Sequence, residues 1–344
     1  MRFFKRGSDA GPIADFWTWW EGARDRVSRA VASGGFDDRL VEDISRAVRT
    51  VHPAMAWELA PGRNAEHAFC LSPEGNPEVR QAALRWLDAA PPPDATWEYH
   101  PARQASPTLR GLEIGGTRFD LDETRVIASW DEVRRRVDVR LWHPGFPQAS
   151  RDVRLQVAFL FLDNLLGEDE VERWIGEVTL LDAPTGGRTP DELGAEIERR
   201  RNEPVGDETW VLGELTRPNG EVEVVLADSA LKRIDHPFAD HHVEIVVLLA
   251  DDRLPDDATA AVLNAEEEAL LGLLDGLALY AGRTTAPGRR TMHFVATDPD
   301  ALKPGIDAWA AGLPDAWPNG ERRRIKVNFE EDMGWTFQRE LGIR

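Results

Sequence analysis

The feature that most limits the possible folds of this chain is the order of its elements after residue 205. Arg217-Pro-Asn-Gly220 separates two alternating apolar runs, and Asn-Gly between such runs is typical of a tight β-hairpin. The apolar pattern then changes repeatedly between period two, typical of strands, and steps of three and four, typical of helices. It predicts a strand, a helix, two strands, a helix and a final strand, over residues 243–250, 258–274, 277–285, 290–297, 299–311 and 322–329.

This βαββαβ order is that of the ferredoxin-like fold. We therefore predict a ferredoxin-like domain over residues 205–344, with the β-hairpin of residues 209–227 preceding its first βαβ unit. Apolar side chains occupy both sides of the strand at 243–250. That strand is expected to be central and buried on both faces.

Residues 1–204 are predicted to form a separate α+β domain with antiparallel sheets, ending at the polar connector Asn202-Glu-Pro204. The helix at 149–166 is apolar nearly all round between Leu155 and Leu162, so we expect it to be buried on several sides. The other expected helices and strands lie at 15–31, 37–51, 76–89 and 190–201, and at 54–60, 66–72, 96–102, 125–130, 137–142 and 174–181.

The charge balance excludes several classes of partner. The chain holds 61 acidic and 41 basic residues, a net charge of -20 that repels a phosphate backbone, so direct binding of nucleic acid is not expected. No apolar run approaches the roughly 20 residues of a spanning helix, and the basic start is not followed by an apolar signal segment. The single cysteine, Cys70, excludes a disulfide framework and fits a reducing compartment. We expect a cytoplasmic protein.

One stretch resembles a known family. Tyr280-Ala-Gly-Arg-Thr-Thr-Ala-Pro-Gly-Arg-Arg290, followed by Met292-His-Phe294 and preceded by Glu266-Glu-Glu268, is similar to the bacterial domain of unknown function 695. The resemblance covers residues 209–341, and its most specific element is Tyr-x-Gly-Arg-Thr. It implies a ferredoxin-like fold and supplies no catalytic residues.

The same stretch contains a candidate binding site with two interpretations. Because a guanidinium matches carboxylate or phosphate in shape, its arginines could hold an anion. Alternatively, Arg283 pairs with a glutamate of the preceding acidic helix, since arginines in an acidic protein usually find internal partners. The residues of this candidate site are Tyr280, Arg283, Thr284, Arg290, Glu266, Glu267 and Glu268.

A second candidate is a metal site in the segment His236-Pro-Phe-Ala-Asp240-His241-His242. Imidazole and carboxylate are ligands of zinc and of other divalent metals. However, His241 and His242 are adjacent at the start of a strand and should point to opposite faces of the sheet. At most two of the three histidines can therefore converge on one ion. A polar loop leading into a buried strand is the competing interpretation.

No nucleotide-binding, nucleophile-elbow or zinc-protease motif occurs, so no cofactor is expected. We therefore predict a non-enzymatic regulatory or protein-binding module. Residues 205–344 hold 26 acidic and 14 basic side chains, which favours a basic protein partner, as for an inhibitor of a nuclease or toxin. The alternative is a metal-dependent or anion-binding enzyme that uses His236, His241, His242 and Arg283.

Overall fold

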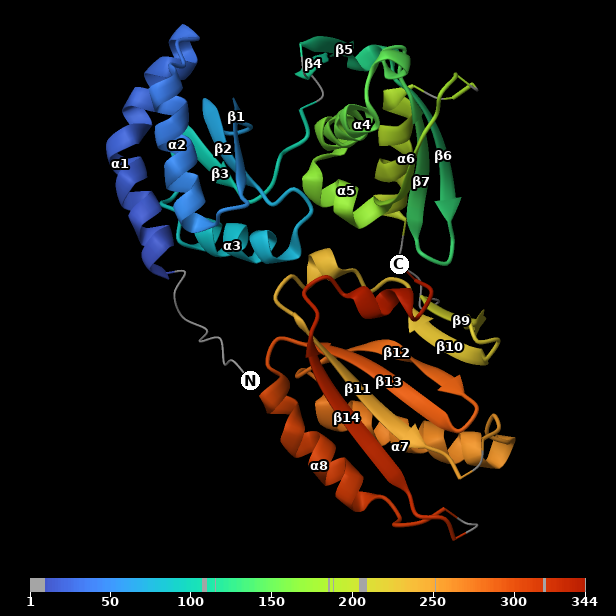
Figure 1. Ribbon diagram of the computed structural model, residues 1–344. Coiled ribbons are helices and arrows are strands. Elements are labelled where there is room, and N and C mark those ends of the chain that lie inside the picture. The colour runs from blue at the N-terminus through green and yellow to red at the C-terminus, as the bar shows by residue number, and fades with distance from the viewer. Residues whose placement is uncertain are drawn as a thin grey trace. The chain divides into compact units, whose positions relative to one another are not determined.

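The computed structural model describes residues 10–106, 110–114, 116–184, 186–187, 189–203, 209–250, 252–317 and 320–343. The chain is a mixed α and β protein that divides into two compact units (Figure 1). Unit 1 contains residues 1–129 and 137–201, and unit 2 contains residues 130–136 and 202–344. None of the described helices combines the length and the apolar character needed to cross a membrane.

Unit 2 is built on a six-stranded sheet with the strand order β14-β11-β13-β12-β10-β9, in which every adjacent pair is antiparallel. Helix α7 connects β11 to β12 and helix α8 connects β13 to β14, and each connection passes over one intervening strand. The elements are β9 (Trp210–Thr216), β10 (Val222–Asp228), β11 (His241–Leu248), α7 (Asp257–Leu274), β12 (Leu279–Ala286), β13 (Arg289–Ala296), α8 (Lys303–Gly312) and β14 (Arg324–Glu331).

The two helices cover one face of this sheet (Figure 1). The core beneath them is apolar and contains Val243, Ile245, Met292 and Phe294 from the strands and Leu263, Leu270, Ile306 and Trp309 from the helices. The opposite face carries a smaller core, where the C-terminal segment packs Trp335 and Phe337 against the sheet. Strand β11, predicted to be central, lies inside the sheet between β14 and β13, one position from the edge. Its second face is only partly covered, because Val246 and Leu248 have intermediate exposure.

Unit 1 contains two three-stranded sheets and a short hairpin. Its strands are β1 (Ala56–Pro61), β2 (His67–Ser72), β3 (Trp97–His100), β4 (Gly111–Ile114), β5 (Thr117–Asp120), β6 (Arg125–Asp131), β7 (Arg136–Trp142) and β8 (Ile175–Leu180), except that the end of β6 and the first residue of β7 fall within residues 130–136 of unit 2. Its helices are α1 (Ala10–Ser33), α2 (Asp38–Val51), α3 (Pro77–Asp88), α4 (Arg151–Leu166), α5 (Glu168–Trp174) and α6 (Pro190–Asn202).

The prediction that these sheets are antiparallel is wrong for one pair in each. Strand β2 is parallel to β3 and β7 is parallel to β8. In both cases a helical connection lies between the two strands, and such a crossover returns the chain in its original direction. The sheets are therefore mixed.

The core of unit 1 is rich in aromatic residues between helices α1–α3 and the first sheet. Trp20 lies against Phe69 and Trp97, and its indole N–H donates to the Tyr99 hydroxyl at 2.9 Å. A buried indole needs such an acceptor, so this bond fixes α1 on β3. Helix α4 departs from expectation, because Phe159 is 46 % exposed while Val157 and Phe161 are buried. Among the described residues, the side of this helix that carries Phe159 is therefore exposed.

Candidate functional sites

The Tyr-x-Gly-Arg-Thr stretch forms a β-bulge in β12. The pairing with β13 shifts between Tyr280 and Gly282, so that Tyr280 lies opposite Phe294 and Arg283 lies opposite Met292. Residues three apart in a regular strand point to opposite faces. The bulge instead places Tyr280 and Arg283 on the same face, beneath α7.

Both side chains bind one buried carboxylate. Glu267, on α7, is 4 % exposed and accepts from the Tyr280 hydroxyl at 2.8 Å and from Arg283 Nη1 at 2.6 Å. Arg290 Nη1 lies 3.5 Å from the same carboxylate and donates to Asn264 Oδ1 at 2.8 Å. A buried charge requires a partner of this kind. The group of Glu267, Tyr280, Arg283 and Arg290 is called the Glu267 network below.

Burial dominates the electrostatics of this network. It lowers the pKa of Arg290, with the neighbouring Arg283 acting in the same direction. It raises the pKa of Tyr280 above its ordinary value, and the Glu267 charge adds to that effect. The tyrosine therefore stays protonated and donates to Glu267 throughout the physiological range.

The remaining residues of the predicted binding site are separated from this network. Glu266 pairs with Arg323 at 2.5 Å, and Glu268 is exposed on α7. Thr284 follows Arg283 in β12, is buried and points to the other face of the sheet. The arginines thus have internal carboxylate partners, and the acidic triplet 266–268 presents one free carboxylate to solvent.

The predicted metal ligands also do not meet. His241 Nδ1 lies 2.7 Å from Asp240 Oδ1, and the His236 ring stacks on Trp335 at 6.3 Å between centroids. His242 points to the opposite face from His241, as the strand alternation requires. Arg283 lies on the α7 face, so the four residues of the expected enzyme site are not assembled in one place.

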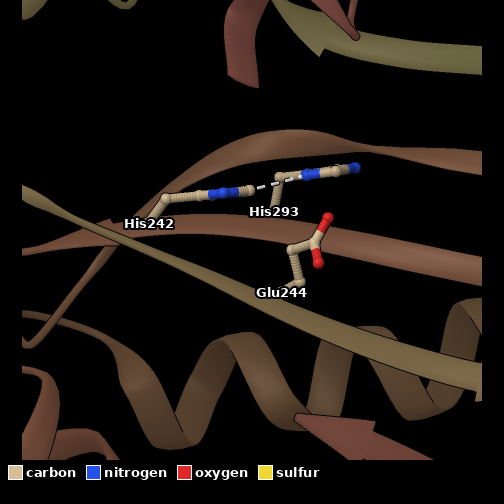
Figure 2. A group of neighbouring side chains, drawn as sticks. All are labelled: His242, Glu244 and His293. Atoms are coloured by element: carbon tan, nitrogen blue, oxygen red, sulfur yellow. Dashed lines mark hydrogen bonds between the residues drawn. The ribbon is translucent and has the colours of Figure 1, made fainter. Parts of the chain in front are cut away.

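A different cluster forms around His242. His242 Nε2 and His293 Nδ1 lie 3.1 Å apart and share a hydrogen bond, and Glu244 rises from β11 beside the His293 ring (Figure 2). One ligand-type atom from each of the three residues lies within 4.8 Å of the other two. Glu244 and His293 are opposite each other in the β11–β13 pairing. We call these residues the His242 cluster.

The His242 cluster lies in the partly covered face of the sheet. Phe337 stacks on the His242 ring with a centroid distance of 4.2 Å, and Asn328 Nδ2 donates to Glu244 Oε2 at 3.0 Å. Burial lowers the pKa of His242, and burial together with His242 lowers the pKa of His293 to about 3. Both imidazoles are therefore neutral at pH 7, with lone pairs available.

The sequence indicates part of this cluster through the two-residue spacing of His242 and Glu244, and not through the neighbouring histidines His241 and His242. His242 and Glu244 are two residues apart in a strand and must share a face. His293 lies between two apolar residues in the strand predicted to follow the hairpin turn. His293 meets His242 and Glu244 only because the strand order of the sheet places β13 next to β11.

Unit 1 contains a group of carboxylates around one arginine. Arg103 lies 3.4 Å from Glu58, 3.3 Å from Glu74 and 3.6 Å from Asp163. Buried Glu168 accepts from the Arg103 backbone N–H at 3.1 Å. Burial, with Glu168 next in effect, raises the pKa of Asp163 to about 7. One cation therefore compensates for several acids, and Asp163 carries a proton more readily than an ordinary aspartate.

Among the described residues of unit 2, the most exposed large apolar side chain is Leu212, which lies on the edge strand β9. Ser229 N donates to Thr209 O at 2.9 Å and Arg217 N donates to Glu221 O at 2.8 Å. Alternate residues of a strand direct their backbone polar groups to the same side, so the odd-numbered residues of β9 face β10. The N–H and C=O groups of Trp210, Leu212 and Glu214 therefore point away from the sheet.

No strand of the described residues pairs with that edge. Trp210 is 41 % exposed and Leu212 is 71 % exposed. Comparison with known proteins adds no assignment to these sites, because no family model, curated protein or solved structure matches the chain.

Proposed function

We propose that this chain is a non-enzymatic protein-binding module that receives an extended segment of a partner protein along β9. The free edge of β9 is the observation that carries the proposal. A row of unpaired backbone groups is a template for another strand, and the exposed Trp210 and Leu212 offer apolar contacts to alternate side chains of that strand.

The charge of the chain supports a basic partner. Residues 205–344 have a net charge of -12, from 26 acidic and 14 basic side chains. Such a surplus speeds the encounter with a positively charged protein and weakens as salt screens it. A nuclease or toxin with a basic surface has the chemistry that this surface would recognise.

The proposal includes a ferredoxin-like arrangement for unit 2, extended at one edge by the β9–β10 hairpin. The strand order β14-β11-β13-β12 and the two crossing helices support it. Membership of the family of domain of unknown function 695 is part of the same proposal and depends on the Tyr280–Arg290 stretch. The buried, unpaired Cys70 supports a cytoplasmic location.

A single proline substitution in the edge strand β9 tests this function. Leu212→Pro removes an N–H that points away from the sheet, so the fold should tolerate it, whereas an added strand would lose a hydrogen bond and meet the proline ring. Leu212→Thr, which keeps the N–H, is the matched control. With each protein as bait in a lysate of its host, we expect a basic protein that the wild type and the Thr variant retain and the Pro variant loses.

Hydrogen exchange then locates the contact. The amides of Trp210, Leu212 and Glu214 should gain protection in the complex, and the association rate should fall as salt is raised. Retention of the same partner by Leu212→Pro would refute binding at this edge. If the purified wild type forms a dimer that Leu212→Pro converts to a monomer, the occupant is a second copy and the basic partner is excluded.

A further inference from the structure

The His242 cluster is not explained by the proposed binding role. His293 is 2 % exposed, and its Nε2 has no hydrogen-bond partner. Two neutral imidazoles that share one hydrogen bond leave this nitrogen unsatisfied in either tautomer. A buried polar atom without a partner costs about 1–3 kcal/mol, so the side chains alone do not complete the cluster.

The spacing of the donor atoms fits a single metal ion. Two nitrogens bound to zinc at about 2.0–2.1 Å are separated by about 2.9–3.4 Å when the angle at the metal is near-octahedral to tetrahedral. His242 Nε2 and His293 Nδ1 are 3.1 Å apart. The ligand-type atom of Glu244 lies within 4.8 Å of both rings. A rotation of the two rings that turns both nitrogens toward a common point would therefore convert the hydrogen bond into shared coordination.

The surroundings prepare these residues for a cation. The amide of Asn328 donates to Glu244 Oε2 at 3.0 Å and so orients the carboxylate, as outer partners do in metal sites. Glu330 and Asp332 lie near enough to act electrostatically on His242, together with Glu244 itself, whereas the cation Arg217 acts on His293 with the opposite sign. These acids attract positive charge to the cluster, while Phe337 covers one side of the His242 ring.

We propose that His242, Glu244 and His293 form a binding site for a divalent transition-metal ion of the zinc class. Two imidazoles and a carboxylate are ligands that zinc accepts, and three protein ligands leave a coordination position open. The ligands come from two adjacent, paired strands, β11 and β13. This site lies on β11 and β13, apart from the β9 edge, and does not depend on the partner-binding role.

Metal titration of the full chain tests the proposal. The purified protein is stripped with chelator and titrated with Zn²⁺ alone by calorimetry, and with Co²⁺ alone by visible absorption. We expect one ion per chain. Glu244→Gln, a near-isosteric change at a half-exposed position, should weaken binding by about 100-fold or more, and Asn328→Ala by about 10- to 100-fold.

Matched controls separate this site from its neighbours. His241→Ala and His236→Ala remove histidines outside the cluster and should leave the affinity unchanged. His293→Ala alters a buried position, so its circular dichroism is compared with that of the wild type before titration. The proposal is overturned if the wild type binds no ion, if Glu244→Gln binds as tightly as the wild type, or if His241→Ala abolishes binding.

Discussion

Replacing Gly282 by alanine is expected to destabilise unit 2 by about 2–6 kcal/mol. The residue has φ = +141°, a conformation that costs other residues about 1–3 kcal/mol. An added Cβ would lie 2.8 Å from Ala227 Cα and closer still to the Leu226 carbonyl oxygen, both in the backbone of β10. Because backbone atoms of a paired strand cannot rotate away, β10 and β12 must separate locally. Loss of one or two of their hydrogen bonds adds about 1–3 kcal/mol.

Native-state hydrogen exchange is the suitable assay, because it reports the opening free energy of each unit separately. The amides of β10, β12 and β13 should exchange faster in Gly282→Ala, while those of β2 in unit 1 stay unchanged. Gly272→Ala in α7 is the control: its Cβ would have no neighbour within 4 Å, and the change should stabilise the helix by about 0.5–1 kcal/mol. A loss below about 1 kcal/mol for Gly282→Ala would refute the argument that the bulge requires glycine.

Three further changes test other parts of the structure. Glu267→Gln should lower the free energy of unfolding by about 3–5 kcal/mol in urea titrations, because it leaves buried Arg290 and half-buried Arg283 without an anion, whereas exposed Glu268→Gln should change it by less than about 0.5 kcal/mol. Asp163 has a pKa of about 7 in the folded chain against 3.8 in the unfolded chain, so its contribution to the free energy of unfolding falls as pH rises between these values. The free energy of unfolding of Asp163→Asn should therefore exceed that of the wild type by about 1–4 kcal/mol at pH 8 and equal it at pH 3. Asp37→Ala removes the cap on the Leu40 amide and should cost about 0.5–2 kcal/mol in thermal unfolding.

Local patterns were sufficient to predict most elements of unit 2. The Asn-Gly turn and the period-two runs place β9, β10, β12 and β13 within a few residues of their observed bounds, because turn chemistry and strand alternation act over short distances. In unit 1 the same rules missed the hairpin of β4 and β5 and the separate helix α5. Those segments are short, and their few apolar residues give weak periodicity.

The candidate sites depend on features that periodicity does not encode. Pairing of Arg283 with the acidic helix was one of two predicted interpretations, but the choice of Glu267 follows from the bulge, which changes the face of Tyr280 relative to Arg283. Likewise, His242 meets His293 only because β13 lies beside β11 in the sheet. Strand direction in unit 1 was also missed, although the helix predicted between the strands of each pair is the crossover connection that parallel strands require.

The position of β14 has a consequence for the synthesis of the protein. Strand β11 ends at Leu248, yet β14, which completes one of its edges, begins only at Arg324, and Phe337 follows later still. At about 5–20 residues per second, a ribosome needs about 4–15 s to make the intervening chain. During that interval β11 has an unpaired edge, and its second face lacks Phe337. The nascent chain is therefore most vulnerable to misassociation just before its last strand emerges, and that interval is when chaperone contact would protect it most.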